Sequence, residues 1–315
     1  MLRSLGTRLL ALVAVLSASF ATIGHAAERL DDTPRTVVMT AYAPEWNALT
    51  SFVDEPVPHE INGWRFIVGK MEGKPIVLME SGVSIVNAAM NTQIAIDRFN
   101  VKRIVFSGVA GGVDPSLAIG DVLIADRWGQ YMETAFARWT VDGYKPPIAI
   151  DPEAPASYGM IYPHGVYTGN GSEPRKRHYF FPVDADLLKL AAAMTSLKLE
   201  RCVERSADMP ADAQVCLPNP PKVVVGGTGV TAPVYMDNAQ FREYLFRGWG
   251  ARALEMESGA VSQVAYANQI PVIHIRSLSD LAGGDHEKNA SDVFEDLAAV
   301  NAAHVLRAYL RVLPD

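Results

Sequence analysis

The stretch VKRIVFSGVAGG, residues 101 to 112, passes from an apolar run into a cluster of glycines. A short apolar run bounded by glycines predicts a buried strand that ends in a tight turn. The preceding stretch, residues 84 to 99, carries Val86, Met90 and Ile94 four residues apart, which predicts a helix opened by Ser84. A helix that leads directly into a buried strand is typical of an α/β sheet.

Strands and helices alternate along the rest of the chain. Further strands are predicted at residues 35–42, twice within 63–82, and at 120–128, 222–230, 251–256 and 271–280, with a turn at Pro44. Further helices are predicted at residues 184–199, 238–249, 257–269 and 291–313. This alternation predicts one layered α/β domain over residues 27–315, with a central mixed, largely parallel sheet flanked by helices.

Residues 130 to 182 differ from this pattern in composition and in periodicity. They contain seven prolines and many aromatic residues, without a clear helical or strand period. Loops of this length are uncommon in a compact domain unless they are functional or disordered. We therefore expect an irregular insertion here, which could cap a binding site and alter its preference.

The first 26 residues have the composition of a secretory signal peptide. Arg3 and Arg8 precede the apolar stretch LLALVAVLSASF, and small residues follow up to a plausible cleavage point after Ala26. The alternative is an uncleaved N-terminal anchor, although charges begin at once with Glu28. No later apolar run is long enough to span a membrane. The sequence predicts an exported protein, periplasmic or secreted.

The net charge argues against a nucleic-acid partner. The whole chain has a formal charge of −7, and loss of the two arginines with the signal peptide makes this about −9. The dense basic cluster, RKRH at residues 175 to 178, reads as a solvated loop. An acidic protein without a basic stripe is a poor candidate for binding nucleic acid.

The two cysteines of the chain, Cys202 and Cys216, lie in one stretch rich in proline and aspartate. In an exported protein they could close a loop of about 15 residues, a link worth about 3 kcal/mol on the chain-entropy model. Sequence gives no distance between them, so a disulfide and a pair of free thiols both remain open. Neither has the surroundings of a nucleophile.

Three acids and the glycine-rich turn fall at predicted strand ends. Glu45 follows the first strand, Glu257 follows residues 251–256, and Asp280 ends residues 271–280. Ligands of open α/β sheets bind beyond the carboxyl ends of the strands, so these groups should share one rim. Singly, each has a structural explanation: a favourable charge at a helix start, a turn residue, or a tight turn. The turn has neither a dinucleotide fingerprint nor a phosphate-binding lysine.

Together, these segments carry a resemblance. TAYAPE (residues 40–45), SGVAGGVDPSLAIGDVLIAD (107–126), ALEMESGAV (253–261) and VIHIRSLSDLAGG (272–284) resemble the purine nucleoside phosphorylase and uridine phosphorylase superfamily. Within it they are most similar to the nucleosidases that hydrolyse 5′-methylthioadenosine and S-adenosylhomocysteine. The resemblance runs from about residue 36 to 313 and breaks down at 130–182 and at the cysteine stretch. It implies a phosphorylase/hydrolase-like fold.

The resemblance implies roles that suit cleavage of a bond between purine and ribose, which leaves positive charge on the sugar and negative charge on the base. Asp280 would donate a proton toward purine N7, which requires a pKa above the usual value for aspartate. Glu257 would accept hydrogen bonds from the ribose hydroxyls, and Met256 would pack against the ribose. Glu255, two residues back on the strand, is expected to lie outside the site.

Glu45 matches the acid that orients the attacking water in the hydrolases, and Arg276 would hold Glu45 or the water in place. The phosphorylases instead use an N-terminal loop with glycine and arginine to contact phosphate. TAYAPEWNAL, residues 40 to 49, has no arginine, and Arg35 comes too early to replace it, which favours water.

The remaining predicted substrate contacts are Tyr42, Gly111, Val109, Val234 and Tyr235. Val109 stands where the nucleosidases carry serine, so one polar contact near Glu257 is missing. TAPVYMDN, residues 231 to 238, replaces the usual base-contacting segment, which places Val234 and Tyr235 near the purine only loosely.

Other functions remain open in the sequence. The signal peptide, SDLAGG and TAPVYMDN also resemble the plant bark and vegetative storage proteins of the superfamily, so a non-catalytic nucleoside-binding or storage protein is an alternative, as is a phosphate-dependent phosphorylase. We expect no cofactor and no metal, and His274, alone within a strand, is expected to be a packed core residue. A purine nucleoside is the expected partner, and the resemblance implies a homodimer.

Overall fold

A computed structural model describes residues 28–203, 215–285 and 289–314. The predicted signal peptide, residues 1–26, lies outside these ranges. Within them, no helix combines the length and the apolar character needed to cross a membrane.

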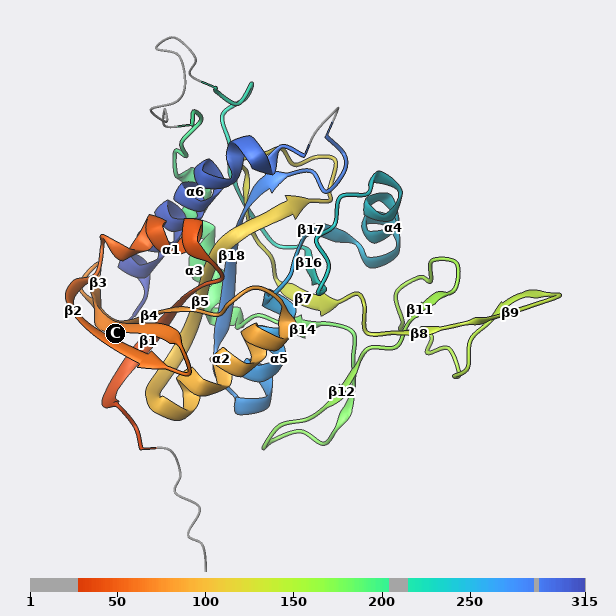
Figure 1. Cartoon of the computed structure of the whole chain (residues 1–315), viewed down its shortest axis with the longest axis horizontal. Coiled ribbons are helices and arrows are strands. Elements are labelled where there is room, and N and C mark those ends of the chain that lie inside the picture. The colour runs from red at the N-terminus through yellow and green to blue at the C-terminus, as the bar shows by residue number, and fades with distance from the viewer. Residues whose placement is uncertain (1–27, 204–214, 286–288, 315) are drawn as a thin grey trace, which may run out of the picture.

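The described chain forms a large mixed sheet with helices on both faces (Figure 1). The strands of this sheet are β1 (Asp31–Thr40), β2 (Asp54–Ile61), β3 (Trp64–Met71), β4 (Lys74–Glu80), β5 (Phe99–Gly112), β6 (Val122–Ile124), β7 (Arg127–Gln130), β14 (Phe181–Pro182), β15 (Val223–Val225), β16 (Thr228–Thr231), β17 (Ala251–Glu255) and β18 (Val272–Asp280). The helices are α1 (Ala43–Thr50), α2 (Ile85–Arg98), α3 (Ala185–Ala191) with the 3-10 turn Ala192–Ser196, α4 (Ala239–Trp249), α5 (Ser258–Asn268) and α6 (Ser291–Val312). The predicted mixed α/β architecture is confirmed.

Strand β5 is the centre of the sheet. It pairs in parallel with β1 and β18, and its last residues pair antiparallel with β17. Successive residues point to opposite faces, as the two-residue period of a strand requires. Ile104 packs with the side chains of α2 and α5, and Val105 packs with those of α6. Burial on both faces explains why the three successive residues 104–106 of this strand are all apolar.

The predicted tight turn at residues 108–112 is wrong, because β5 continues through Gly112. Here the glycines make room for side chains. A Cβ on Gly108 would lie 2.2 Å from Arg276 Nη1 and 2.6 Å from Glu45 Oε1, and one on Gly111 would lie 3.0 Å from Asp280 Oδ1. The glycine cluster therefore permits charged groups to approach the strand closely.

Several other boundaries differ from the sequence prediction. The expected turn at Pro44 is the start of helix α1, because proline is well tolerated in a first helical turn. The predicted strand 120–128 is two short strands, β6 and β7. Strand β2 was not predicted, since its burial alternates weakly at the sheet edge.

Helix α2 forms where the spacing predicted it, but its buried face is different. Val86 and Met90 are 74% and 41% exposed, whereas Ala88 and Ala95 are fully buried. Small residues face the protein because α2 packs closely against α5. Val86 and Met90 thus form an exposed apolar stripe on this chain, whereas Ile94 packs against the core.

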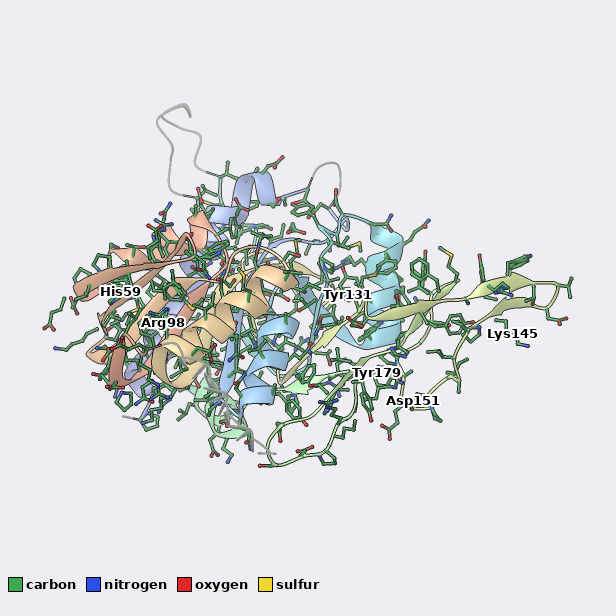
Figure 2. The ribbon with its side chains drawn as sticks, turned by 60° about the horizontal axis from the view of Figure 1, so that its bottom comes forward. His59, Arg98, Tyr131, Lys145, Asp151 and Tyr179 are labelled. Carbon is green, nitrogen blue, oxygen red and sulfur yellow. A yellow bond between two sulfur atoms is a disulfide. The ribbon has the colours of Figure 1, made fainter. Side chains whose placement is uncertain are left out.

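Residues 130–182 extend away from the sheet as a set of short hairpins. The pairs are β8 (Thr134–Phe136) with β11 (Ile161–Pro163), β9 (Arg138–Thr140) with β10 (Gly143–Lys145), and β12 (Val166–Thr168) with β13 (Lys176–His178). Figure 2 shows Lys145 far out on this arm and Tyr131 at its base. The segment rejoins the sheet through β14, which pairs with β7.

Cys202 and Cys216 form a disulfide in the structure, and a short antiparallel bridge joins the same two residues. The alternative of two free thiols does not hold for the described chain.

Candidate active site

A cavity of about 210 Å³ opens where β1, β17 and β18 end and along the last residues of β5. Its walls contain every predicted site residue except Arg276. The lining residues are Ala41, Tyr42, Glu45, Val83, Val109, Ala110, Gly111, Val234, Tyr235, Met236, Leu254, Glu255, Met256, Glu257, Ser279, Asp280, Ser291 and Glu295. The predicted rim therefore exists, and it encloses a pocket.

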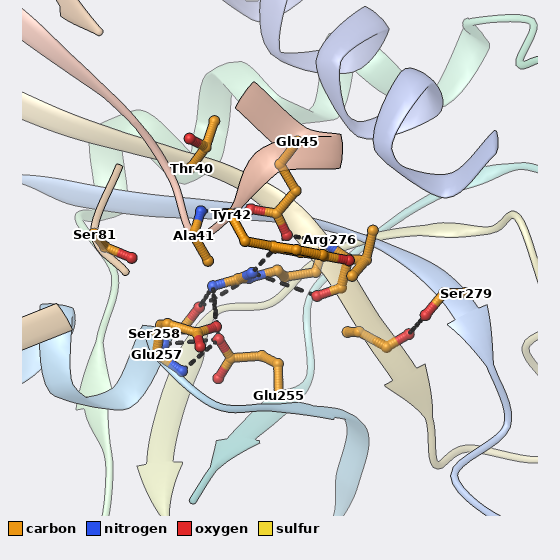
Figure 3. Close-up of polar contacts among 12 residues, drawn as sticks. Thr40, Ala41, Tyr42, Glu45, Ser81, Glu255, Glu257, Ser258, Arg276 and Ser279 are labelled. Atoms are coloured by element: carbon orange, nitrogen blue, oxygen red, sulfur yellow. Dashed lines mark hydrogen bonds and ion pairs between the residues drawn. The ribbon is translucent and has the colours of Figure 1, made fainter. Parts of the chain in front are cut away.

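Arg276 lies behind the pocket wall, with no exposed surface. Its Nη2 is 2.6 Å from Glu255 Oε2 and 3.7 Å from Glu257 Oε2, while its Nη1 is 3.8 Å from Glu45 Oε1 (Figure 3). Nε and Nη2 also donate to Ser258 Oγ at 3.0 and 2.9 Å. The guanidinium is a central cation among three carboxylates, so its contact with Glu45 is weaker than predicted.

Glu255 is the main partner of Arg276, and its predicted place outside the site is wrong. Besides the ion pair, Oε2 accepts hydrogen bonds from the backbone N–H groups of Glu257 and Ser258, and Oε1 accepts one from Thr231 Oγ. Glu255 is part of the pocket wall and fixes both Arg276 and the start of α5.

Glu45 projects from the first turn of α1 and is almost fully buried. Oε2 accepts from Ala41 N at 2.5 Å and Oε1 accepts from Val109 N at 2.8 Å. Burial raises the pKa of Glu45 to about 7, against the opposing effects of Arg276 and these two N–H donors. A carboxyl group with this pKa can gain or lose a proton near neutral pH, which suits a general base that acts on water.

Glu257 occupies the position just before α5 and is also buried. Burial is the main cause that raises the pKa of Glu257, and the neighbouring charge of Glu255 raises it further. Arg276 is a single cation and cannot neutralise all three carboxylates around it. Oε1 accepts from Ser84 N at 2.8 Å. Ser84 adopts φ 80, a strained conformation for a residue with a side chain, and this conformation accompanies the N–H contact with Glu257.

Asp280 lies across the cavity at the end of β18. Ser279 Oγ donates to its Oδ2 at 2.8 Å and Ala282 N donates to its Oδ1 at 2.7 Å. Burial nevertheless raises its pKa, since desolvation outweighs these hydrogen bonds. The group is thus both held in place and shifted toward the protonated form that a proton donor needs.

A sequence model of the phosphorylase superfamily matches residues 35–311, nearly the whole described chain. The chain belongs to the phosphorylase superfamily.

Two relatives of this chain are nucleosidases of the same name. The 5′-methylthioadenosine/S-adenosylhomocysteine nucleosidase of Mycobacterium bovis is 30% identical over 253 residues, covering 79% of this chain and 85% of the relative. The nucleosidase of the same name from Listeria innocua is 31% identical over 256 residues, covering 80% and 88%.

Two solved structures share the fold of this chain. A Streptococcus pneumoniae nucleosidase of this type, in complex with 8-aminoadenine, matches with a TM-score of 0.63 at 24% identity, covering 89% of this chain and all of that one. A Helicobacter pylori futalosine hydrolase matches with a TM-score of 0.63 at 22% identity, covering 89% and 98%.

The pocket of this phosphorylase-superfamily chain also contains residues that sequence reasoning missed. Ser291 and Glu295 come from the start of α6, and Ser279 precedes Asp280. The pattern of residues 291–313 predicted the helix but not that its first turns face the rim. Only the "SD" pair itself could have pointed to Ser279.

His274 is fully buried, and its Nε2 is 2.7 Å from Ser262 Oγ. Burial lowers its pKa well below the usual value, so it is a neutral core residue. Within the described ranges, no three His, Cys, Asp or Glu side chains are arranged to hold a metal ion. Three of the pocket carboxylates, Glu45, Glu255 and Glu257, lie around Arg276 instead.

Proposed function

We propose that the protein hydrolyses the N-glycosidic bond of a purine nucleoside of the 5′-methylthioadenosine/S-adenosylhomocysteine type and releases the base. The observation that carries this proposal is the meeting of Glu45, Glu257 and Asp280 in one cavity. The relatives from Mycobacterium bovis and Listeria innocua, each over 79% or more of this chain, support the same reaction.

Asp280 serves as the general acid for the leaving purine. Its raised pKa lets it hold a proton, and the Ala282 N–H and Ser279 hydroxyl keep the carboxyl group oriented across the cavity. Protonation at N7 withdraws electrons from the glycosidic bond and stabilises the departing base. General acids of this kind contribute about 10²- to 10⁴-fold to rates.

Glu257 and Glu45 act at the sugar half of the substrate. Glu257 accepts hydrogen bonds from the ribose hydroxyls, and its negative charge stabilises the cationic sugar of the transition state. Glu45, fixed by Ala41 N and Val109 N, orients the water that attacks the anomeric carbon. Val109 offers its backbone N–H to Glu45, so a valine side chain at this position leaves that contact intact.

Water suits this cavity better than phosphate. None of the described residues that line it is Lys, Arg or His, and the guanidinium of Arg276 lies behind the wall, engaged by carboxylates. A phosphate dianion would have to enter among four buried acids without a free cation among the described lining residues. A non-catalytic storage protein is also less well supported, because it would have no use for so costly a cluster.

The test is base release from 5′-methylthioadenosine and S-adenosylhomocysteine by the mature protein, with and without inorganic phosphate. We expect adenine and free sugar at a rate that phosphate does not change. Release that requires phosphate and yields a sugar 1-phosphate would instead show a phosphorylase.

We also propose that residues 1–26 direct export and are then removed. Amino-terminal sequencing of the protein from a periplasmic or culture fraction should begin at Ala27. A start at Met1, or protein confined to the cytoplasm, would contradict this.

A homodimer is the proposed assembly. The exposed apolar stripe of α2, with Val86 and Met90, extends to Val83 in the cavity wall, and a second copy would cover it. Light scattering should give twice the mass of the mature chain, and Val86→Glu should reduce it to the monomer. An unchanged mass for the variant would place the interface elsewhere.

A further inference from the structure

The first turns of α6 contribute two polar side chains to the cavity wall that the proposed hydrolysis does not use. Tyr42 Oη donates to Glu295 Oε1 at 2.6 Å, and Tyr235 Oη and Ser291 Oγ are 2.8 Å apart. Among the described residues, no hydrogen bond reaches the other carboxylate oxygen of Glu295. This oxygen is an available acceptor on the wall of a nucleoside pocket.

A second, outer cavity of about 540 Å³ adjoins the first and shares Tyr235, Ser291 and Glu295 with it. Its other lining residues are Asp292, Val293 and Asp296. Three acids and no cation therefore surround this outer space within the described chain. A cavity lined by charge of one sign concentrates ligands of the opposite sign.

The positions of the acids indicate which part of a nucleoside would reach Glu295. Asp280 faces the base and Glu257 the ribose hydroxyls, which leaves the 5′ carbon as the remaining branch of the sugar. Tyr42 lies beside this sugar region and lines the cavity together with Glu45 and Glu257. Burial raises its pKa, the charge of Glu45 raises it further, and its hydroxyl donates to Glu295. A 5′ substituent that passes Tyr42 meets Glu295 and then the outer cavity.

We propose that Glu295, positioned by Tyr42, selects nucleosides whose 5′ substituent carries a hydrogen-bond donor, above all a cationic amino group. The carboxylate oxygen left free by Tyr42 accepts the donor, and the acids of the outer cavity favour its positive charge. A 5′ phosphate, which adds only negative charge, is disfavoured for the same reason. This inference rests on the proposed nucleosidase activity and names its preferred substrates.

The experiment compares two adenine nucleosides of equal length. One carries a 5′-(3-aminopropyl)thio group and the other a 5′-butylthio group, so an ammonium replaces a methyl group. We expect wild-type kcat/KM to favour the amino compound by about tenfold or more, as a hydrogen bond to a charged group allows. Raising the salt concentration should reduce this ratio, because screening weakens the attraction of the outer acids.

Variants assign the preference to Glu295. Glu295→Gln should bring the ratio close to one, while Glu295→Asp, which keeps the charge on a shorter side chain, should retain part of it. The matched control is Glu60→Gln, the same change on an exposed residue of the edge strand β2, and it should leave the ratio at the wild-type value.

A ratio near one in the wild type, or an undiminished ratio in Glu295→Gln, would overturn the inference. Failure of the proposed function has a different signature, because then neither compound nor 5′-methylthioadenosine would release adenine.

Discussion

Replacing Arg276 by Met should destabilise the protein by about 4 kcal/mol, within the range of about 3–5 kcal/mol for removing one member of a buried ion pair. The variant keeps the apolar length of the side chain but removes the cation shared by Glu45, Glu255 and Glu257. Ser258 Oγ loses two donors as well. Glu255 keeps three other donors, which limits the loss to the middle of the range.

Urea unfolding with the disulfide intact would give the free energy of unfolding. Arg311→Met is the matched control, since Arg311 bonds Glu72 on the surface with its side chain 53% exposed and should cost less than about 1 kcal/mol. The double variant Arg276→Met, Glu255→Gln should recover part of the loss, because one uncompensated charge disappears. A cost for Arg276→Met no greater than for Arg311→Met would refute the reasoning.

The deficit of Arg276→Met should also depend on pH. Without the guanidinium, the pKa values of the buried carboxyl groups rise further, and the folded state then binds more protons than the unfolded state between about pH 4.5 and those raised values. Stability of the variant should therefore increase as pH falls from 8 toward 5, relative to wild type. A deficit that stays constant over this range would show that packing, not charge, is lost.

Three further predictions follow from the same geometry. Because the pKa of Glu45 is about 7 and its ionised form orients water, kcat/KM should rise between pH 6 and 8. Glu45→Gln should lose most of the activity, and its remaining kcat/KM should no longer rise over this pH range. Gly108→Ala should cost about 1–3 kcal/mol in urea unfolding by displacing Arg276 and Glu45, whereas exposed Gly171→Ala should cost less than about 0.5 kcal/mol. Cys202→Ser should lose about 3 kcal/mol, and a reductant should lower the melting temperature of wild type but not of the variant.

The elements near the site were largely predictable from sequence, because burial on both faces leaves continuous apolar runs such as residues 104–106. The α2 helix was predictable from its spacing, but its face was not. Periodicity identifies the apolar side of a helix, and here Val86 and Met90 lie on a side that this chain leaves exposed. Ala88 and Ala95 face inward because a close helix contact requires small residues.

For the site, too, the sequence predicted some features and not others. Strand ends and a family resemblance located Glu45, Glu257 and Asp280. They could not show that Glu255 is the main partner of Arg276. Glu255 and Glu257 both lie where β17 passes into α5, and the sequence does not tell which of the two side chains is nearer the arginine. Nor could they place Glu295 in the pocket wall. The sequence predicts the helix that carries Glu295, but tertiary packing decides which way that helix points.

The role of Asp280 as proton donor is the centre of this account. The most direct measurement is the rate of adenine release from 5′-methylthioadenosine by Asp280→Asn, beside Asp142→Asn, the same change on an exposed turn of the arm. We predict a loss of at least about 10²-fold for Asp280→Asn and wild-type rates for Asp142→Asn. Wild-type release by Asp280→Asn would contradict the assignment of the acid.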